Sequence, residues 1–238
     1  MSRPRLLDLF CGAGGASVGY HHAGFDVVGV DIEQQPKYPF ESIQADALKL
    51  LRTGLKTGMI CGVWRLADFD AIHASPPCQP HSSLTGWGGT RRVAPGRVDL
   101  IPETRTLLTC AGLPYVIENV EGAGLHNAAR ICGQGLGLRV RRHRRFESNV
   151  PLMSVGCHHH EPPVIVVRGS IGRKVFDPRR KAIAPSLALA REVMEMPWAS
   201  ASELADAIPP RYTEHIGSYL LAEVESRAAS SDTQEKTA

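Results

Sequence analysis

The chain has 238 residues, which is long enough for one full hydrophobic core and a smaller appendage. Its 43% hydrophobic and 21% charged residues are typical of globular proteins and exclude a disordered or fibrous chain. The net charge of +3 is mild, and no apolar run approaches the ~18 residues of a membrane span. Because the N-terminus leads directly into a strand pattern without a signal peptide, we expect a cytoplasmic protein with no membrane partner.

The cysteines are scattered and include no Cys-x-x-Cys pair. This pattern disfavours a disulfide framework or a zinc ribbon and favours free thiols in a reducing compartment. The run Cys157-His158-His159-His160 contains metal-ligand residue types, but adjacent histidines in a loop rarely converge on one ion. We therefore expect no bound metal.

The N-terminal part predicts a strand over 5–10, a glycine-rich turn over 11–15, a helix over 16–23 and a second strand over 25–31. The turn therefore lies before a helix N-terminus, a position that suits ligand binding. It is not a P-loop, and Ser17 replaces the third glycine of the dinucleotide fingerprint, which disfavours an oxidoreductase.

Two acids follow at expected strand ends. Asp31 ends the second strand, where a carboxylate can accept hydrogen bonds from ribose hydroxyls, and Asp46 comes at the next strand end. This layout favours a nucleoside without a pyrophosphate, of which S-adenosylmethionine is the common example. The alternative is that Gly12 and Gly14 only make a tight turn.

A candidate nucleophile follows the apolar run 69–74, which predicts a buried strand. Pro76 and Pro77 exclude a helix there, so the thiol of Cys78 stands on a stiff loop at the carboxyl end of a strand. In an open α/β sheet, ligands bind outside those strand ends.

The next segments predict a helix over 102–113 and an apolar strand over 114–120. Glu118 near the tip of that strand is a candidate acid or hydrogen-bond donor, and a solvated strand-end acid is the alternative. Two short strands are expected over 136–140 and 145–147. Two basic clusters favour a phosphate-backbone partner, with solvated surface as the alternative: Arg139, Arg141, Arg142, Arg144 and Arg145, and then Arg168, Arg173, Lys174, Arg179, Arg180 and Lys181.

The last third changes in composition. We expect a small lobe over 149–184 with a strand-like run over 164–167, and helices over 186–196, over 200–205 and from 209 onward. The main domain would then comprise 1–148 and 185–226, and the polar tail 227–238 would be disordered.

Five segments in order resemble motifs of the cytosine-5 DNA methyltransferases. They are Asp8-Leu9-Phe10-Cys11-Gly12-Ala13-Gly14-Gly15, Ser75-Pro76-Pro77-Cys78-Gln79, Glu118-Asn119-Val120, Arg142-His143-Arg144 and Ala205-Asp206-Ala207-Ile208-Pro209-Pro210. Any one of them is weak, but the ordered set spans most of the chain. The resemblance implies an α/β, Rossmann-like S-adenosylmethionine-dependent methyltransferase fold, a mostly parallel sheet flanked by helices, with a small target-recognition lobe.

The resemblance also implies residue roles. Cys78 would add to carbon 6 of cytosine, and Glu118 would supply or share the proton at ring N3. Arg144 would hold the base and orient Glu118, Arg142 would sit beside it, and Asn119 would organise the Pro-Cys loop. The implied cofactor-binding residues are Asp8, Phe10, Cys11, Gly12, Ala13, Gly14, Asp31, Ile32, Asp46, Ala47, Pro77, Asp206 and Ala207.

Three positions depart from the family pattern. His81 stands where the family has a bulky hydrophobic residue, Asp206 where it has Asn, and Val140 where it has Gln before Arg-x-Arg. The short lobe suggests a short recognition site, low specificity or a helper subunit, since base edges are read by such lobes. Double-stranded DNA is the implied partner. The alternatives are methylation of tRNA and a weakly active nucleic-acid-binding homologue.

Overall fold

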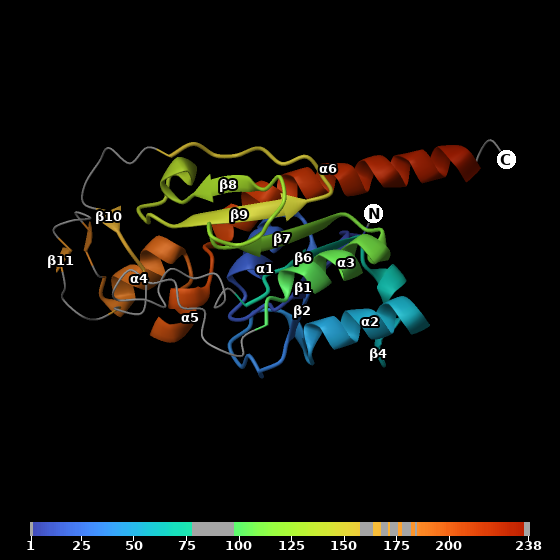
Figure 1. Ribbon diagram of the computed structural model, residues 1–238, viewed down its shortest axis with the longest axis horizontal. Coiled ribbons are helices and arrows are strands. Elements are labelled where there is room, and N and C mark those ends of the chain that lie inside the picture. The colour runs from blue at the N-terminus through green and yellow to red at the C-terminus, as the bar shows by residue number, and fades with distance from the viewer. Residues whose placement is uncertain are drawn as a thin grey trace.

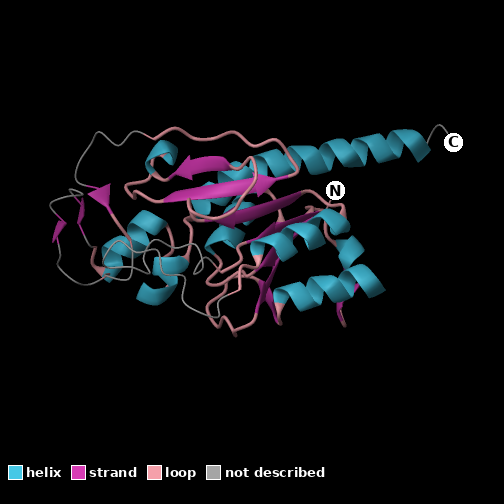
Figure 2. Cartoon of the chain, in the orientation of Figure 1, coloured by secondary structure: helices cyan, strands magenta, loops and turns pink. Residues whose placement is uncertain are grey.

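The computed structural model describes residues 2–77, 98–157, 164–167, 171, 176–177, 182–183 and 185–235. A seven-stranded sheet crosses the molecule with helices on both faces (Figures 1 and 2). The strand order is β3-β2-β1-β6-β7-β9-β8. The strands are β1 (Arg5–Leu9), β2 (Asp26–Asp31), β3 (Glu41–Gln44), β6 (Ala71–Ala74), β7 (Tyr115–Asn119), β8 (Ala129–Cys132) and β9 (His143–Ser148).

The strand directions explain where a ligand can bind. β3, β2, β1, β6 and β7 are parallel, and β9 runs antiparallel to both β7 and β8. The carboxyl ends of the five parallel strands therefore meet at one edge of the sheet, which is where open α/β sheets bind ligands. This mostly parallel, helix-flanked sheet is the Rossmann-like arrangement expected from the sequence.

Two apolar clusters cover the two faces of the sheet. On one face, α2 (Ala47–Thr57) and α3 (Ile101–Ala111) pack on residues such as Leu9, Ile72 and Ile117. On the other face, α1 (Gly15–Ala23) and α6 (Pro210–Glu235) pack on alternate residues of the same strands, such as Leu6 and Val116. Strands buried on both faces read as continuous apolar runs, which is why the sequence predicts them well.

A third cluster joins the C-terminal helices to the sheet. It includes Val140, Ile165 and Met194 and lies around α4 (Leu187–Met194) and α5 (Ala201–Asp206). Beside it is a small sheet of order β10-β12-β11, made by β10 (Val164–Ile165), β12 (Ala182–Ile183) and β11 (Phe176–Asp177). The remaining short elements are β4 (Met59–Cys61), β5 (Trp64–Arg65), η1 (Leu66–Asp68) and η3 (Gln134–Leu136).

One predicted strand is wrong. Residues 136–140 do not form a strand, because Gly137 has a φ of 79° and Val140 makes only an isolated bridge to Ile165. The outer antiparallel neighbour of β9 is β8, which lies earlier in the chain and was not predicted. A left-handed glycine ends η3 and cannot continue a strand ladder.

The C-terminal helix differs from the expectation of a disordered tail from residue 227. α6 continues to Glu235, and residues 227–235 contain neither glycine nor proline to end it. A polar composition suggested disorder, but it also suits an exposed helix end. Neither α6 nor any other helix in the described part of the chain is both long and apolar enough to cross a membrane.

Candidate active site

The glycine-rich turn lies at the carboxyl end of β1. Its backbone is unusual: φ is positive at Phe10 (61°), Gly12 (48°) and Gly14 (83°). A bulky residue such as Phe10 rarely adopts a positive φ, and such conformations are concentrated at functional sites. A Cβ atom at Gly14 would lie 2.8 Å from Pro39 Cδ, whereas one at Gly12 would meet no described atom within 4 Å. The turn is therefore packed at Gly14 and open beside Gly12.

The acids at the next strand ends surround this turn. Asp31 accepts hydrogen bonds from the Gly12 amide and from the Glu33 amide, both at 2.9 Å, so its carboxylate fixes the turn. Ile32 beside it is 67% exposed, which leaves an apolar side chain available to a ligand. Asp46 is the N-cap of α2 and accepts from the Lys49 amide at 3.0 Å. The Ala47 side chain is buried in the core, so only its backbone can reach a ligand.

Asp8 lies in β1 below the turn and is completely buried. Ser17 donates a hydrogen bond to its Oδ2, and Tyr38 donates to the Ser17 hydroxyl at 2.7 Å. Burial raises the pKa of Asp8 to about 7, although the Ser17 hydrogen bond opposes the shift. Its Oδ1 has no hydrogen-bond partner among the described residues. Ser17, which disfavoured dinucleotide binding, is thus part of the site, and so is Tyr38, whose role could not be predicted from any local pattern.

These residues fit the expected cofactor. The open space beside Gly12, the exposed Ile32 and the carboxylates of Asp31 and Asp46 make a cradle that can hold a nucleoside. Cys11 and Ala13 are buried within the turn, and Trp198 donates from Nε1 to the Ala13 carbonyl at 2.8 Å. That hydrogen bond, which could not be predicted from the sequence, links the glycine turn to the C-terminal part of the chain.

The loop after β6 is held by the neighbouring strands. The Ser75 amide donates to the Leu9 carbonyl at 3.1 Å, and Asn119 Nδ2 donates to the Pro76 carbonyl at 2.9 Å. Asn119 is buried, so this bond holds the loop against the end of β7. Pro77 is exposed at the end of this segment. The candidate nucleophile Cys78, like His81, lies outside the described residues.

Glu118 is buried at the carboxyl end of β7, opposite Phe146 of β9. Arg144 Nε lies 2.8 Å from Glu118 Oε1, but that oxygen has no hydrogen bond of good geometry from any described residue. Burial raises the pKa of Glu118, and the charges of Arg144 and Arg142 oppose the shift. The pair therefore offers a carboxyl group that can hold a proton and an acceptor oxygen that a ligand can satisfy.

A buried polar chain that the sequence did not reveal reaches this carboxyl group. Tyr20 Oη is 2.9 Å from His73 Nδ1, and His73 Nε2 is 2.8 Å from the Ser75 hydroxyl. Burial lowers the pKa of His73 to about 3, so its ring stays neutral at neutral pH. Ser75 in turn hydrogen-bonds Glu118 and lowers its pKa. A lone histidine in an apolar strand carries no pattern from which this chain could be predicted.

Arg142 lies close enough to Glu118 and Arg144 for their charges to interact, while its hydrogen bonds go to other groups. Its buried guanidinium donates to the carbonyls of Val167 and Leu204 at 3.1 and 3.2 Å, and also to Ala205. It therefore anchors the end of α5, next to the exposed Asp206. The following residues pass close to the glycine turn, since the Ile208 carbonyl would lie 2.3 Å from a Cβ at Gly15. Asp206 and Ala207 are thereby brought toward the candidate cofactor site.

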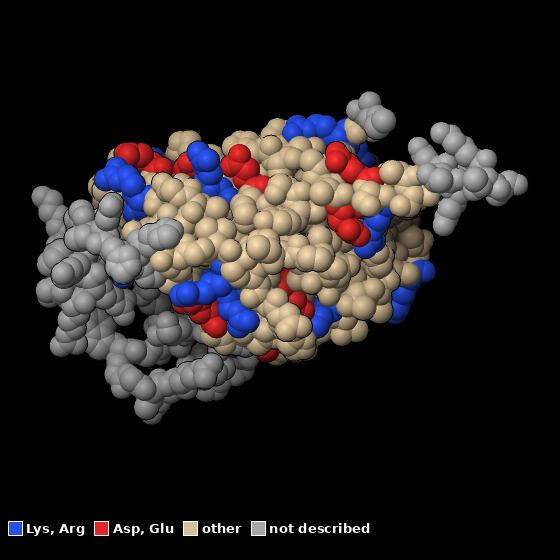
Figure 3. Space-filling view, turned by 90° about the horizontal axis from the view of Figure 1, so that it is seen from above, with Lys and Arg blue, Asp and Glu red and all other residues tan. Residues whose placement is uncertain are grey.

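The first basic cluster is not a continuous exposed surface. Arg142 and Arg144 are taken up by the buried contacts described above, while Arg139 is exposed and pairs with Glu192 at 3.3 Å. Figure 3 shows basic and acidic side chains interspersed on the face seen from above. The second cluster, from Arg168 to Lys181, falls outside the described residues.

We expect the buried Asp8 to make stability depend on pH. Between about pH 4 and 7 the folded chain retains a proton that the unfolded chain has lost, because an unperturbed Asp has a pKa of about 3.9. The contribution of Asp8 to the free energy of unfolding therefore falls as pH rises through this window, by about 1.4 kcal/mol per pH unit. Asp8→Asn removes this term, so the variant should gain stability relative to wild type from pH 5 to 7 in urea unfolding.

Two observations make the Asp8 experiment specific. The contribution of His73 to the pH dependence has the opposite sign, because its lowered pKa reduces the free energy of unfolding as pH falls. That contribution is the same in variant and wild type, so it cancels in the difference between them. Ser17→Ala should extend the Asp8 window to higher pH, since it removes the hydrogen bond that lowers this pKa. Parallel curves for wild type and Asp8→Asn would contradict the prediction.

Comparison with known proteins agrees with this geometry. Residues 4–133, more than half of the chain, match the model of the C-5 cytosine-specific DNA methylase family. A curated relative, the Type II methyltransferase M.XorII of Xanthomonas oryzae pv. oryzae, is 31% identical over 157 residues. This match covers 63% of the chain but only 32% of M.XorII, so the chain spans about a third of that relative's length.

Solved structures share the fold at low sequence identity. A mutant of DNMT2 from Spodoptera frugiperda has a TM-score of 0.57 at 12% identity, covering 91% of this chain and 99% of that one. The methyltransferase EhMeth of Entamoeba histolytica has a TM-score of 0.55 at 10% identity, covering 94% and 99%. These similarities establish a methyltransferase fold over nearly the whole chain. Taken with the family match over residues 4–133, which include the glycine turn and the Glu118 strand, they lead to one conclusion: the chain belongs to the C-5 cytosine-specific DNA methylase family.

Proposed function

We propose that the protein transfers a methyl group from S-adenosylmethionine to carbon 5 of cytosine in DNA. The observation that carries this proposal is the buried Glu118, paired with Arg144 and joined through Asn119 to the loop that leads to Cys78. Family membership supports the same reaction. A buried carboxyl group with a raised pKa beside a cysteine loop suits chemistry that must both add a nucleophile and move a proton.

The proposed reaction follows from the weak nucleophilicity of carbon 5. The Cys78 thiolate adds to carbon 6, and Glu118 supplies the proton that relieves negative charge at ring N3. Carbon 5 would then behave as an enamine carbon and take the methyl group, with S-adenosylhomocysteine as the leaving group. Loss of the carbon 5 proton to a base, elimination of the Cys78 thiolate and return of the N3 proton to Glu118 would restore the aromatic ring. Arg144 holds the Glu118 carboxyl group in place throughout.

S-adenosylmethionine, when bound, supplies the electrophilic methyl group. In this chain, Phe10 and Ile32 would offer apolar surfaces for the adenine, Asp31 would accept from the ribose hydroxyls, and Asp46 would accept from the adenine amino group. The remaining residues assigned to this pocket are Asp8, Cys11, Gly12, Ala13, Gly14, Ala47, Pro77, Asp206 and Ala207. The open space beside Gly12 and the positive φ angles of the turn support this assignment.

Double-stranded DNA is the proposed partner, in the setting of DNA modification. Carbon 5 is stacked inside a duplex, so the cytosine must be flipped out to reach Cys78. We assign target recognition to residues 149–184, a segment whose described part includes the small sheet β10-β12-β11. So short a recognition lobe is compatible with a short target site or a helper subunit.

The test is tritium transfer from labelled S-adenosylmethionine to cytosine-rich duplex DNA and, in parallel, to tRNA. We expect label at carbon 5 of DNA cytosine, and Cys78→Ala should reduce it to background. Cys110→Ala is the matched control, because Cys110 is an exposed cysteine on α3 and should transfer at the wild-type rate. Label on tRNA alone would show that tRNA, and not DNA, is the substrate. No label on either, with cofactor still bound, would overturn the proposal in favour of a binding role.

A further inference from the structure

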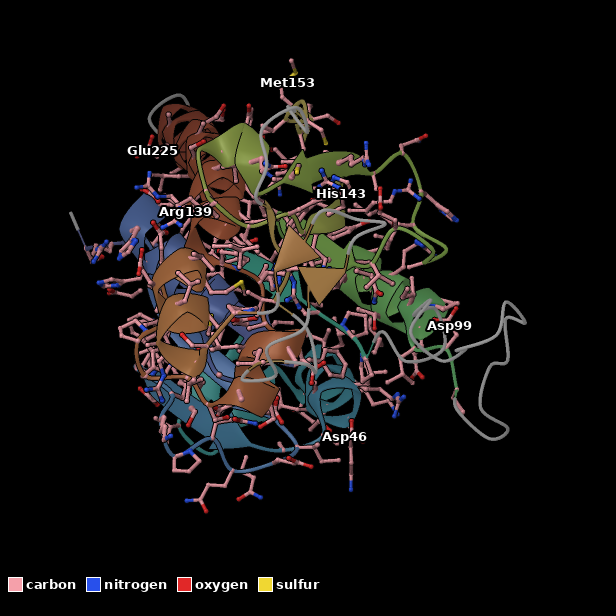
Figure 4. All side chains as sticks on the ribbon, turned by 90° about the vertical axis from the view of Figure 1, so that its left-hand side faces the viewer. Asp46, Asp99, Arg139, His143, Met153 and Glu225 are labelled. Carbon is pink, nitrogen blue, oxygen red and sulfur yellow. The ribbon has the colours of Figure 1, made fainter. Side chains whose placement is uncertain are left out.

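Three metal-ligand residues meet at the β8–β9 edge of the sheet. Cys132 is the last residue of β8 and His143 the first of β9, and they are register partners, so their side chains share one face. Cys157 comes from the segment after β9, which returns beside β8 through a 3.0 Å bond from the Val155 amide to the Arg130 carbonyl. The ligand atoms of the three residues all lie within 4.8 Å of one another. Figure 4 shows His143 on this side of the molecule, far from Asp46.

The separation of these atoms suits a tetrahedral ion. With Zn–S bonds of about 2.3 Å and Zn–N bonds of about 2.0 Å, sulfur and nitrogen ligands of one zinc ion lie roughly 3.5 Å apart. His143 Nε2 lies 3.3 Å from Cys157 Sγ. None of the five described cysteines forms a disulfide bond. Small side-chain adjustments are therefore enough to place all three ligand atoms around one ion.

The surroundings of His143 match those of a metal-binding histidine. Its Nδ1 lies 3.1 Å from Glu121 Oε2, and Glu121 is itself held by Arg130 Nε at 2.6 Å. Arg130 Nη2 also approaches Nδ1, at 3.1 Å. The tautomer with hydrogen on Nδ1 donates to Glu121 and leaves the Nε2 lone pair facing Cys157. Such a carboxylate behind the ring is the usual partner of a zinc-bound histidine.

We propose that Cys132, His143 and Cys157 bind one Zn²⁺ ion. Two thiolates and an imidazole are ligands that zinc prefers, and the two negative sulfurs balance its charge. The fourth position is left to a water molecule or another oxygen ligand. The sequence contains no Cys-x-x-Cys pair that would predict a zinc site, and it is the strand pairing that brings these three residues together.

The site has a structural consequence that goes beyond the proposed methyl transfer. Successive side chains of a strand point to opposite faces, so His143 and Arg144 lie on opposite sides of β9. An ion at His143 fixes the start of the strand that presents Arg144 to Glu118. We therefore expect metal removal to loosen the β8–β9 edge without touching the cofactor cradle at the far end of the sheet order.

The test measures metal in the full chain by elemental analysis and by Co²⁺ substitution. We expect one Zn²⁺ per chain, and a Co²⁺ form with tetrahedral d–d bands and thiolate charge-transfer absorption. Cys132→Ser, Cys157→Ser and His143→Ala should each lower Zn²⁺ affinity by at least ~100-fold, and Glu121→Gln by about 10-fold to 100-fold. Cys110→Ser, which changes an exposed cysteine on α3, should retain one ion per chain.

Three results would overturn the proposal. The first is the absence of Zn²⁺ binding at micromolar concentration by a folded chain whose thiols are reduced. The second is metal that remains bound in both Cys132→Ser and His143→Ala, which would place the ion elsewhere. The third is a Cys132–Cys157 disulfide found by mass spectrometry in protein prepared under reducing conditions. Circular dichroism of each variant shows whether it is folded, and Glu121→Gln keeps the test informative because it alters no ligand.

Discussion

Glu118→Gln should lower the rate of methyl transfer by roughly 10²-fold to 10⁴-fold, the range that proton transfer by a positioned side chain contributes. The amide has the size of the carboxyl group but cannot release a proton to cytosine N3. In the wild type, burial raises the pKa of Glu118 while Arg144 lies 2.8 Å from it, so the group is poised to exchange a proton. Single-turnover rates on duplex DNA measure the effect, and cofactor affinity should stay within a few-fold.

The matched control is Glu147→Gln. Glu147 is another buried glutamate, on β9, where it accepts from Arg105 Nε at 2.6 Å. It is the register partner of Ile117 and so lies on the opposite face of the sheet from Glu118. Loss of its ion pair should lower stability but leave the rate per folded molecule unchanged. Equal rate losses in the two variants would mean that Glu118 acts only through folding.

Gly19→Ala should destabilise the fold by about 1–3 kcal/mol, the usual cost of overpacking. A Cβ at Gly19 would lie 2.0 Å from the Pro210 carbonyl and 2.1 Å from Thr213 Oγ1. At that point α1 and α6 touch, and the Thr213 hydroxyl donates to the Ala16 carbonyl at 2.7 Å. The extra methyl group must therefore push two helices apart. Urea unfolding measures the change in the free energy of unfolding.

Gly54→Ala is the control for helix propensity. Gly54 also lies within a helix, α2, but its Cβ would meet the tip of Ile60 at 2.7 Å and no backbone atom closer than 3.7 Å. A flexible tip can move, and alanine is a better helix former than glycine by about 1 kcal/mol. We expect Gly54→Ala to be neutral or slightly stabilising. If both variants lose the same free energy of unfolding, the close contact between α1 and α6 does not explain the effect of Gly19→Ala.

The prediction of strands from sequence succeeded where a strand is buried on both faces. β1, β2, β6 and β7 are short apolar runs, so the local pattern alone predicted them. It also predicted the acids and the loop that lie at or just after their ends. It failed at β8, because Ala129–Cys132 carries no strong pattern and becomes a strand only by pairing with β9. The pattern over 136–140 was apolar enough to suggest a strand, but Gly137 turns the chain away.

The amino-acid sequence by itself determined the family, the order of the motifs and the identity of most candidate site residues, because these depend on local spacing. Only the tertiary structure decided what each buried polar group contacts. It directed the hydrogen bonds of Arg142 to carbonyls near α5, and it connected Ser17 to Asp8 and His73 to Ser75. It also brought Cys132, His143 and Cys157 together. Burial sets the cost of an unpaired charge, and burial and partners arise only when distant segments pack.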